Sequence, residues 1–191
     1  MDKIKIKLIV GLGNPGHEYE NVRHNTGFLT IDNLQLTINN CSNWKLDKKT
    51  NALISSCQIK TISNVKYQMS KVILAKPQTF INKSGDAVLV LSKFFKIKPE
   101  NILVVHDDID ILWSNFKLSF GRSSAGHKGV ESIIKALKTK NFWRLRIGIQ
   151  PTLKKHMSAD KIILKKFTPA EFKILNQTIK KAISELESAI I

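Results

Sequence analysis

The run Ile4–Val10 ends in a glycine-rich turn, and this junction is the feature that most constrains the fold. The run first alternates apolar and charged residues and then becomes wholly apolar, as a strand entering a sheet core does. In the turn Gly11–Gly16, three glycines bracket Asn14 and Pro15, so we expect a sharp reversal of the chain with the Asn14 amide projecting into open space. Functional side chains should therefore gather where this strand ends.

A dinucleotide site is the obvious alternative, because Gly11–Gly16 satisfies G-x-G-x-x-G after a strand. That fingerprint also needs a helix opening at the glycines and an acidic residue at the end of the next strand. Here Pro15 fixes the backbone within the turn, and Gly27 interrupts any helix begun there. Asp32 has tolerable spacing but falls within Phe28–Leu36, whose apolar spacing indicates a helix. We therefore disfavour a nucleotide site.

Composition suits one soluble domain spanning residues 1–191, since 42% of the residues are hydrophobic. No apolar run is long enough to span a membrane, and the N-terminus leads directly into a strand, so we expect a cytoplasmic protein. Cys41 and Cys57 form no C-x-x-C pair. We interpret both as reduced thiols that form neither a disulfide nor a zinc site.

The charge favours a polyanionic partner. With 31 Lys and Arg against 15 Asp and Glu, the net charge is +16. A lysine-rich surface that only keeps the protein in solution would give the same total. The distribution favours nucleic acid, because ten basic residues and one acid, Glu131, lie between Ile111 and Ala159. The ten are Lys117, Arg122, Lys128, Lys135, Lys138, Lys140, Arg144, Arg146, Lys154 and Lys155.

Strand and helix patterns alternate along the chain, which predicts an α/β fold: a twisted, mixed but largely parallel central sheet with helices on both faces. The predicted strands are Ile4–Leu12, Leu53–Ile59, Lys66–Ala75, Ile102–His106, Asn115–Ser119 and Trp143–Ile149. The predicted helices are Phe28–Leu36, Asn82–Phe95, Val130–Leu137 and a C-terminal helix through Ile190. A capping box, Thr168–Glu171 with proline at the first helical position, opens the last helix. We expect the basic segment Pro151–Lys166 before it to be a mobile flap.

Four polar clusters stand at predicted strand ends, where open α/β sheets bind ligands. They are Asn14 with His24, Lys76–Asn82, His106–Asp110 and Gly126–Gly129. A histidine can take a proton from water near neutral pH, and a carboxylate beside it can orient the ring and stabilise the imidazolium. His24 and Asp107 satisfy that requirement if the fold brings them together.

These clusters, in this order, resemble those of bacterial peptidyl-tRNA hydrolases over nearly the whole chain. The matching pieces are GLGNPGHEYENVRHNTGF, KPQTFINKSG, HDDID, GHKGVESI and RLRIGI. The resemblance implies a monomeric esterase without a metal or other cofactor. It would cleave the ester that joins a peptide to the 3′ ribose of tRNA and so recycle tRNA from stalled translation.

The resemblance also implies roles for individual residues. His24 would activate water, and Asp107 would orient and support it. Asn14 would contact the peptide backbone beside the ester, which helps to separate peptidyl-tRNA from aminoacyl-tRNA. Asn82 would bind the substrate or the attacking water and help to stabilise the oxyanion.

Other matching residues would hold the tRNA. Tyr19 and Phe80 fit the lining of the site for the 3′-terminal nucleotide and peptide, whereas Lys117 and Arg146 match positions that grip a tRNA phosphate. One departure is Lys128, which stands where the family carries asparagine. Lysine donates hydrogen bonds but cannot accept them, so we expect an active site in which Lys128 binds substrate in altered geometry. A second departure, Ile81 for methionine, replaces one apolar side chain with another.

Each residue also has a purely structural interpretation. Asp107 could cap a turn or bind a metal, and His24 could be an ordinary surface histidine, as we take His106 and His127 to be. Asn14 could serve only the turn, and Asn82 only as a helix cap. A noncatalytic module of the same fold that binds RNA ends is the remaining functional alternative.

Overall fold

A seven-stranded sheet forms the centre of the structure, a computed structural model that describes residues 4–38, 40–63, 66–151 and 162–190. Its order is β2-β3-β4-β1-β5-β7-β6, and the four strands from β4 to β7 run parallel, whereas β2, β3 and β6 are antiparallel to their neighbours. The predicted mixed sheet with a parallel core is therefore confirmed. The bounds are β1 Leu8–Gly11, β2 Lys45–Asp47, β3 Ala52–Ser63, β4 Lys66–Pro77, β5 Ile102–Leu112, β6 Phe116–Phe120 and β7 Trp143–Gln150.

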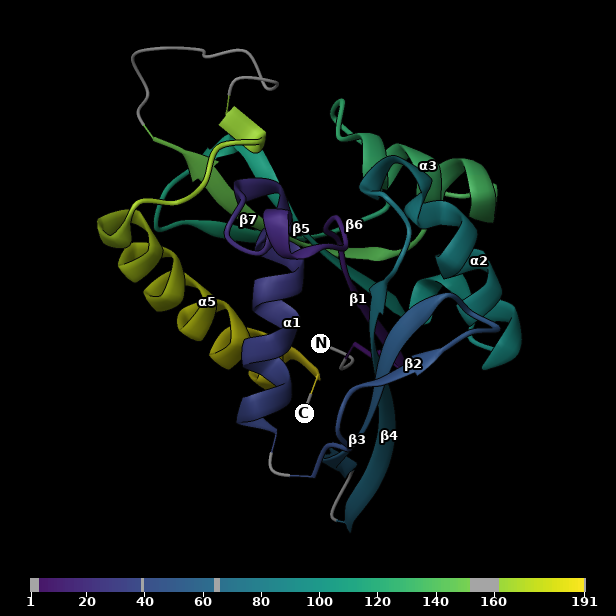
Figure 1. The fold of residues 1–191 in the computed structure, drawn as a ribbon. Coiled ribbons are helices and arrows are strands. Elements are labelled where there is room, and N and C mark those ends of the chain that lie inside the picture. The colour runs from purple at the N-terminus through teal and green to yellow at the C-terminus, as the bar shows by residue number, and fades with distance from the viewer. Residues whose placement is uncertain (1–3, 39, 64–65, 152–161, 191) are drawn as a thin grey trace.

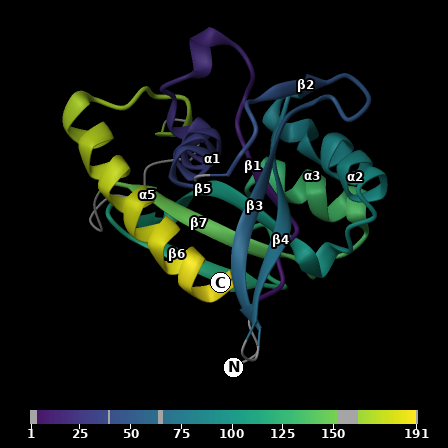
Figure 2. The same ribbon diagram turned by 90° about the horizontal axis from the view of Figure 1, so that it is seen from below.

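Helices cover both faces of the sheet, as predicted (Figures 1 and 2). On one face lie α1 (Thr26–Thr37) and α5 (Pro169–Ile190), and on the other α2 (Ser84–Phe94) and α3 (Lys128–Leu137). Successive side chains of a strand point to opposite faces, so β1 supplies both cores. Ile9 packs in the core under α1 and α5, and Leu8 and Val10 pack in the core under α2 and α3.

Several predicted strands differ in length from those observed, and β1, β3 and β5 differ most. β1 begins at Leu8 rather than Ile4. Lys7 still hydrogen-bonds Asn101 and Ile73 beside the sheet, but the Ile4 N–H bonds the carbonyl of Ala189 at the end of α5. β5 continues from His106 to Leu112, although aspartate is depleted in strands. Pairing of β5 with β7 carries the strand through the aspartates, with an irregularity after Asp108.

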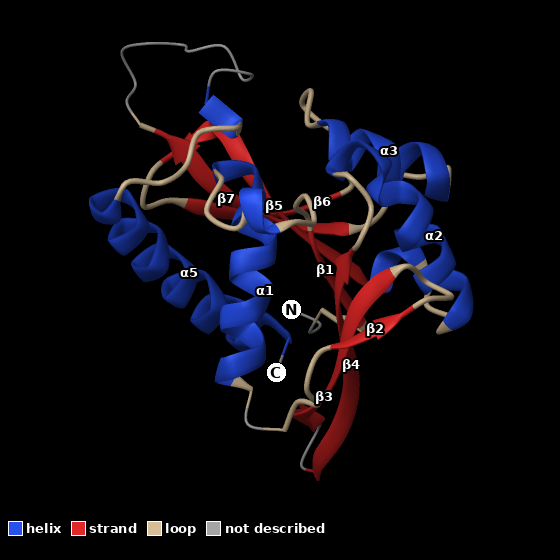
Figure 3. Cartoon of the chain, in the orientation of Figure 1, coloured by secondary structure: helices blue, strands red, loops and turns tan. Residues whose placement is uncertain are grey.

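The strands β3 and β4 form a long antiparallel hairpin that extends beyond the rest of the sheet (Figure 3). Strand β2, which pairs with the start of β3, is three residues long and was not predicted. Among the described residues, no helix combines the length and the apolar character needed to cross a membrane.

The start of α5 confirms the predicted capping box. The Thr168 N–H donates to Glu171 Oε2 at 2.8 Å, and the Glu171 N–H donates to Thr168 Oγ1 at 3.3 Å. Arg23 also binds Glu171, with 2.8 Å between Nη2 and Oε1. The start of α5 is thereby tied to the segment that carries His24. Most of the expected flap Pro151–Lys166 lies outside the described residues.

The prediction of two reduced cysteines is wrong for this structure, in which Cys41 and Cys57 form a disulfide. The segment after α1 makes an antiparallel bridge with β3, and this brings the two Cα atoms to 4.0 Å. The sequence separation of 16 matches no cysteine motif. The pairing depends on a tertiary contact that the sequence pattern did not reveal.

Reducing this disulfide should lower the free energy of unfolding, because it closes a loop with a sequence separation of 16 residues. A closed loop of that size stabilises a protein by ~3 kcal/mol, chiefly by restricting the unfolded chain. Urea unfolding with and without dithiothreitol measures the effect. A Cys41→Ser/Cys57→Ser double variant should match the reduced protein and ignore the reductant, and wild-type stability that also ignores it would contradict the assignment.

Candidate active site

The turn after β1 leads through two short 3₁₀ helices, η1 (His17–Tyr19) and η2 (Arg23–Asn25), directly into α1. The first turn of α1 lies against the main chain of the sheet. A Cβ on Gly27 would lie 2.4 Å from both Leu12 N and Val105 O, so only glycine permits this approach. His24, three residues earlier, is thereby held beside β5.

His24 and Asp107 meet, although 83 residues separate them in sequence. Nδ1 of His24 lies 2.9 Å from each oxygen of the Asp107 carboxylate. His24 is 6% exposed and Asp107 is 2% exposed. The carboxylate accepts the proton on Nδ1, which makes Nε2 the ring nitrogen that carries the free lone pair. No described residue hydrogen-bonds that Nε2.

A second histidine shares the same carboxylate, and sequence reasoning missed it. His127 Nε2 donates to Asp107 Oδ1 at 3.1 Å. Nδ1 of His127 accepts the Val130 N–H at 3.3 Å, so this ring is the N-cap of α3. A signal was present, because His127 lies in a polar cluster at a predicted strand end, three residues before the predicted helix Val130–Leu137, and so close to any site at that helix N-terminus.

Burial and charge act against each other on the pKa values of this cluster. Burial lowers the pKa of His24, but the charge and hydrogen bonds of Asp107 outweigh that effect and raise it overall. For Asp107, burial raises the pKa, yet the two histidines hold it far below its usual range. His106 is fully buried, and its burial keeps the pKa well below the ordinary value. It is neutral and donates from Nδ1 to the carbonyl of Asp107.

A hollow of about 140 Å³ opens beside the pair. Its lining is acidic although the chain as a whole is strongly basic, because Asp107, Asp108 and Asp110 contribute to it beside one lysine, Lys128. The remaining lining residues are His24, Ile109, Ser124, Ala125, Gly126, His127 and Ile163. His24, Asp107 and His127 could also hold a metal ion, since each offers a ligand atom.

Asn14 is not in open space, contrary to expectation. It is 7% exposed, and its Oδ1 accepts the Ile81 N–H at 2.8 Å. Its main chain exchanges two hydrogen bonds with the Asn25 amide, each 2.9 Å long. Asn14 therefore joins the segment that carries His24 to the segment after β4, and its Nδ2 group has no hydrogen bond to a described residue.

Among the described contacts, neither Asn82 nor Lys128 hydrogen-bonds His24 or Asp107. Both line a second hollow, of about 620 Å³, between the starts of α2 and α3. Lys128 also lines the hollow beside His24, so it stands where the two join. Asn82 is exposed, and neither η3 (Ile81–Lys83) nor α2 has a side-chain cap, which removes the capping interpretation of this residue.

The remaining predicted residues form two pairs. Tyr19 and the exposed Phe80 meet edge to face with ring centroids 6.3 Å apart. Lys117 and Arg146 are register partners on β6 and β7. Arg146 Nε lies 2.7 Å from Asp108 Oδ2, one residue from Asp107. The structure therefore brings His24 and Asp107 into contact, Lys128 into the same hollow, and these two pairs around them.

The glycine turn does not open a helix, as a dinucleotide fingerprint requires. Gly16 is followed by the three-residue η1, and α1 begins only at Thr26. The geometry agrees with the sequence in disfavouring a nucleotide site.

Comparison with known proteins identifies the family to which a chain with this arrangement belongs. The family model described as "Peptidyl-tRNA hydrolase" matches residues 8–191. The chain belongs to the peptidyl-tRNA hydrolase family. It is 43% identical to the peptidyl-tRNA hydrolase of Aquifex aeolicus over 97% of this chain and 90% of that protein. It is 38% identical to that of Metamycoplasma arthritidis over 97% and 92% of the two chains. A crystal structure of the peptidyl-tRNA hydrolase from Acinetobacter baumannii matches with a TM-score of 0.85, at 32% identity, over 100% of this chain and 91% of that one.

Substituting Gly27 tests the contact that places His24. Gly27→Ala should lower the free energy of unfolding by about 3 kcal/mol or more, because main-chain atoms of β1 and β5 cannot yield to a new methyl group. Gly126→Ala is the matched control. Its Cβ would meet no atom within 4 Å, and only its φ of +80° opposes the change, at a cost of about 1–2 kcal/mol. Denaturant unfolding compares the two, and an equal or smaller loss for Gly27→Ala would contradict the placement.

Proposed function

We propose that this chain hydrolyses peptidyl-tRNA at the ester between the peptide and the 3′ ribose, without a metal or other cofactor. Membership in the peptidyl-tRNA hydrolase family supports the reaction. The observation that carries the mechanism is the buried contact of 2.9 Å between His24 Nδ1 and Asp107, which leaves Nε2 for a water molecule beside the hollow.

In this mechanism, Nε2 of His24 takes a proton from water as the water oxygen attacks the ester carbonyl carbon. The carbonyl electron pair moves to oxygen and forms a tetrahedral oxyanion. The oxyanion then collapses, and the bond to the ribose 3′ oxygen breaks. The imidazolium of His24 returns its proton to that oxygen, which gives tRNA with a free 3′ hydroxyl and a peptide acid. Asp107 stabilises the imidazolium and fixes the ring tautomer.

Three residues surround the reacting ester in this proposal. Asn14 offers its Nδ2 group to the peptide backbone, since Oδ1 is already bonded to the Ile81 N–H. Asn82 binds the substrate or the attacking water from the adjoining hollow and supports the oxyanion. Lys128 lies where the two hollows join, and its ammonium group can donate to either the substrate carbonyl or a phosphate near the 3′ end.

Two further pairs hold the tRNA. Tyr19 and Phe80 offer aromatic faces to the 3′-terminal nucleotide and peptide, because every base can stack on such a face. Lys117 and Arg146 grip a phosphate. Asp108 binds only Nε of Arg146 among the described contacts, so the two terminal nitrogens remain for phosphate oxygens. We further propose that the chain acts as a monomeric domain in the cytoplasm.

Removing the base should slow turnover with little change in tRNA affinity. General-base catalysis contributes roughly 10²–10⁴-fold, so His24→Ala should lower kcat by about that factor. The assay follows ester loss from an N-blocked aminoacyl-tRNA in the presence of chelator. His17→Ala, the same substitution at a side chain 92% exposed, is the control and should match wild type. A wild-type protein that binds the substrate without cleaving it would favour the noncatalytic RNA-binding alternative.

The proposed phosphate contact of Lys117 and Arg146 predicts that rising salt concentration weakens tRNA binding. Each phosphate contact adds roughly 0.9 to the slope of log affinity against log salt concentration. Arg146→Ala should therefore reduce that slope by about one. Lys138→Ala, an exposed lysine at the end of α3, is the control with an unchanged slope. An unchanged slope for Arg146→Ala would place the phosphate contact elsewhere.

The lysine at position 128 should affect substrate binding. Lys128→Asn removes an ammonium group and adds an acceptor, so we expect a changed KM and a smaller salt slope if Lys128 meets a phosphate. If it meets the carbonyl, kcat should change while the slope stays constant. Steady-state kinetics at several salt concentrations separate the two, and unchanged kcat, KM and slope would remove Lys128 from the site.

A further inference from the structure

Three side chains of the hollow form a compact ligand set. One ligand atom from each of His24, His127 and Asp107 lies within 4.8 Å of the other two, and the nitrogens that face the carboxylate are Nδ1 of His24 and Nε2 of His127. They come from η2, the N-cap of α3 and β5. Two imidazoles and one carboxylate are donors typical of zinc, whereas Mg²⁺ and Ca²⁺ prefer oxygen ligands. We propose that these residues bind Zn²⁺, or a transition-metal ion of similar preference, and that the bound ion reversibly inhibits the enzyme.

The distances suit such an ion. Zn²⁺ binds histidine nitrogen and carboxylate oxygen at about 2.0–2.2 Å, which puts neighbouring ligand atoms of a tetrahedral site roughly 3.3 Å apart. In the structure, Asp107 Oδ1 lies 2.9 Å from His24 Nδ1 and 3.1 Å from His127 Nε2. These two separations need to change by only a few tenths of an ångström. The third, between the ligand nitrogens of the two histidines, lies within 4.8 Å and has to close by up to about 1.5 Å when the ion binds. The neighbouring hollow of about 140 Å³ can supply water as the fourth ligand.

The charge around the three ligands also favours a cation. Asp108 and Asp110 line the same hollow as Asp107, opposed there by Lys128. Arg146 neutralises Asp108 through the contact at 2.7 Å. The carboxylates of Asp107 and Asp110 therefore attract the ion, whereas the ammonium group of Lys128 limits its affinity.

Binding would disable the base by fixing the wrong tautomer. A neutral imidazole bound through Nδ1 carries its proton on Nε2, so His24 would have no lone pair to accept a proton from water. His127, bound through Nε2, would carry its proton on Nδ1 and lose the 3.3 Å bond from the Val130 N–H. In each ring, the nitrogen that binds the ion releases its proton to solvent and the other nitrogen takes one up, so the total number of protons is unchanged. The ion therefore competes with catalysis instead of assisting it, and the lost cap bond keeps binding reversible.

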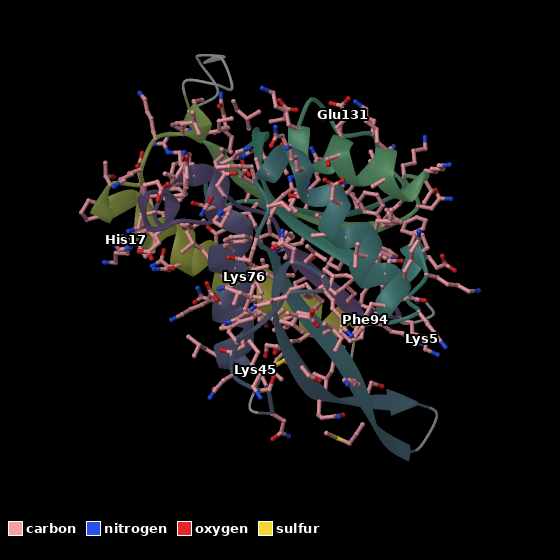
Figure 4. All side chains as sticks on the ribbon, turned by 45° about the vertical axis from the view of Figure 1, so that its right-hand side comes forward. Lys5, His17, Lys45, Lys76, Phe94 and Glu131 are labelled. Carbon is pink, nitrogen blue, oxygen red and sulfur yellow. A yellow bond between two sulfur atoms is a disulfide. The ribbon has the colours of Figure 1, made fainter. Side chains whose placement is uncertain are left out.

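The chain offers a matched control for an ordinary histidine–carboxylate pair. His17 Nδ1 lies 2.9 Å from Glu20 Oε1, but the two side chains are 92% and 60% exposed, and they belong to no described group of three ligands. Figure 4 shows His17 at the left edge of the molecule, well away from Glu131 of α3 near the top of the view. If Zn²⁺ binding requires a third ligand beside a histidine and a carboxylate, His17→Ala should leave the affinity for Zn²⁺ unchanged.

Binding is tested without substrate, by isothermal titration of metal-free protein with Zn²⁺ and by the visible absorption of bound Co²⁺. We expect one principal ion per chain and an unchanged affinity in His17→Ala. His127→Asn should weaken binding by about tenfold or more, because asparagine can still cap α3 but is a poor zinc ligand. Asp107→Asn removes the carboxylate and should do the same, and circular dichroism confirms that both variants are folded. Wild-type affinity in both variants would overturn the proposed site.

Inhibition rests on the proposed function and is tested separately. With N-blocked aminoacyl-tRNA as substrate, Zn²⁺ should lower hydrolysis in proportion to the occupancy measured by titration, and chelator should restore it. Occupancy of these ligands with full activity would overturn the tautomer mechanism. If metal-free wild type fails to cleave the ester, the proposed function fails, and the titrations still decide the binding site.

Discussion

The buried carboxylate of Asp107 is the constraint on which the rest of the site depends. An ionised carboxylate that is 2% exposed is costly unless donors surround it. The donors are two histidines, one just before α1 and the other at the start of α3, and these helices cover opposite faces of the sheet. Satisfying one charge therefore fixes how both helices meet the end of β5. Because the buried carboxylate needs the proton on Nδ1 of His24, the same requirement fixes the tautomer of that ring and leaves the lone pair on Nε2 to act as the base.

Close backbone packing makes that convergence possible. Gly27 lets α1 lie against the main chain of β1 and β5. Gly129 does the same for α3, since a Cβ there would lie 2.9 Å from the Ile81 side chain and 3.0 Å from its carbonyl. The Ile81 N–H in turn binds the Asn14 amide. Each histidine therefore precedes, by two or three residues, the glycine whose close contact fixes its helix. Asn14 connects the two halves of the site.

The sequence was sufficient for residues whose role follows from local pattern. Alternation of strands and helices predicted the mixed sheet, the capping box predicted the start of α5, and strand-end positions brought His24 and Asp107 together in the hypothesis. It failed where partners are set only by tertiary contacts. His127 was taken as an ordinary histidine because its bond to Asp107 spans 20 residues. Cys41 and Cys57 were taken as free thiols because a bridge after α1 pairs them, and β5 was ended too early because pairing with β7 outweighs the low strand propensity of aspartate.

The acidic hollow in a chain of net charge +16 is formed by aspartates near the end of β5, where the pairing with β7 becomes irregular and Asp107, Asp108 and Asp110 all line one hollow. Asp107 binds His24, whereas Asp108 binds Arg146. Under the proposed function, the carboxylate that orients the catalytic base and the carboxylate that holds the phosphate-binding arginine are adjacent residues of β5. Nε of Arg146 holds Asp108 and leaves the two terminal nitrogens for a phosphate, so one guanidinium can serve both anions at once. A phosphate bound there would be fixed one residue along β5 from the carboxylate that orients the base.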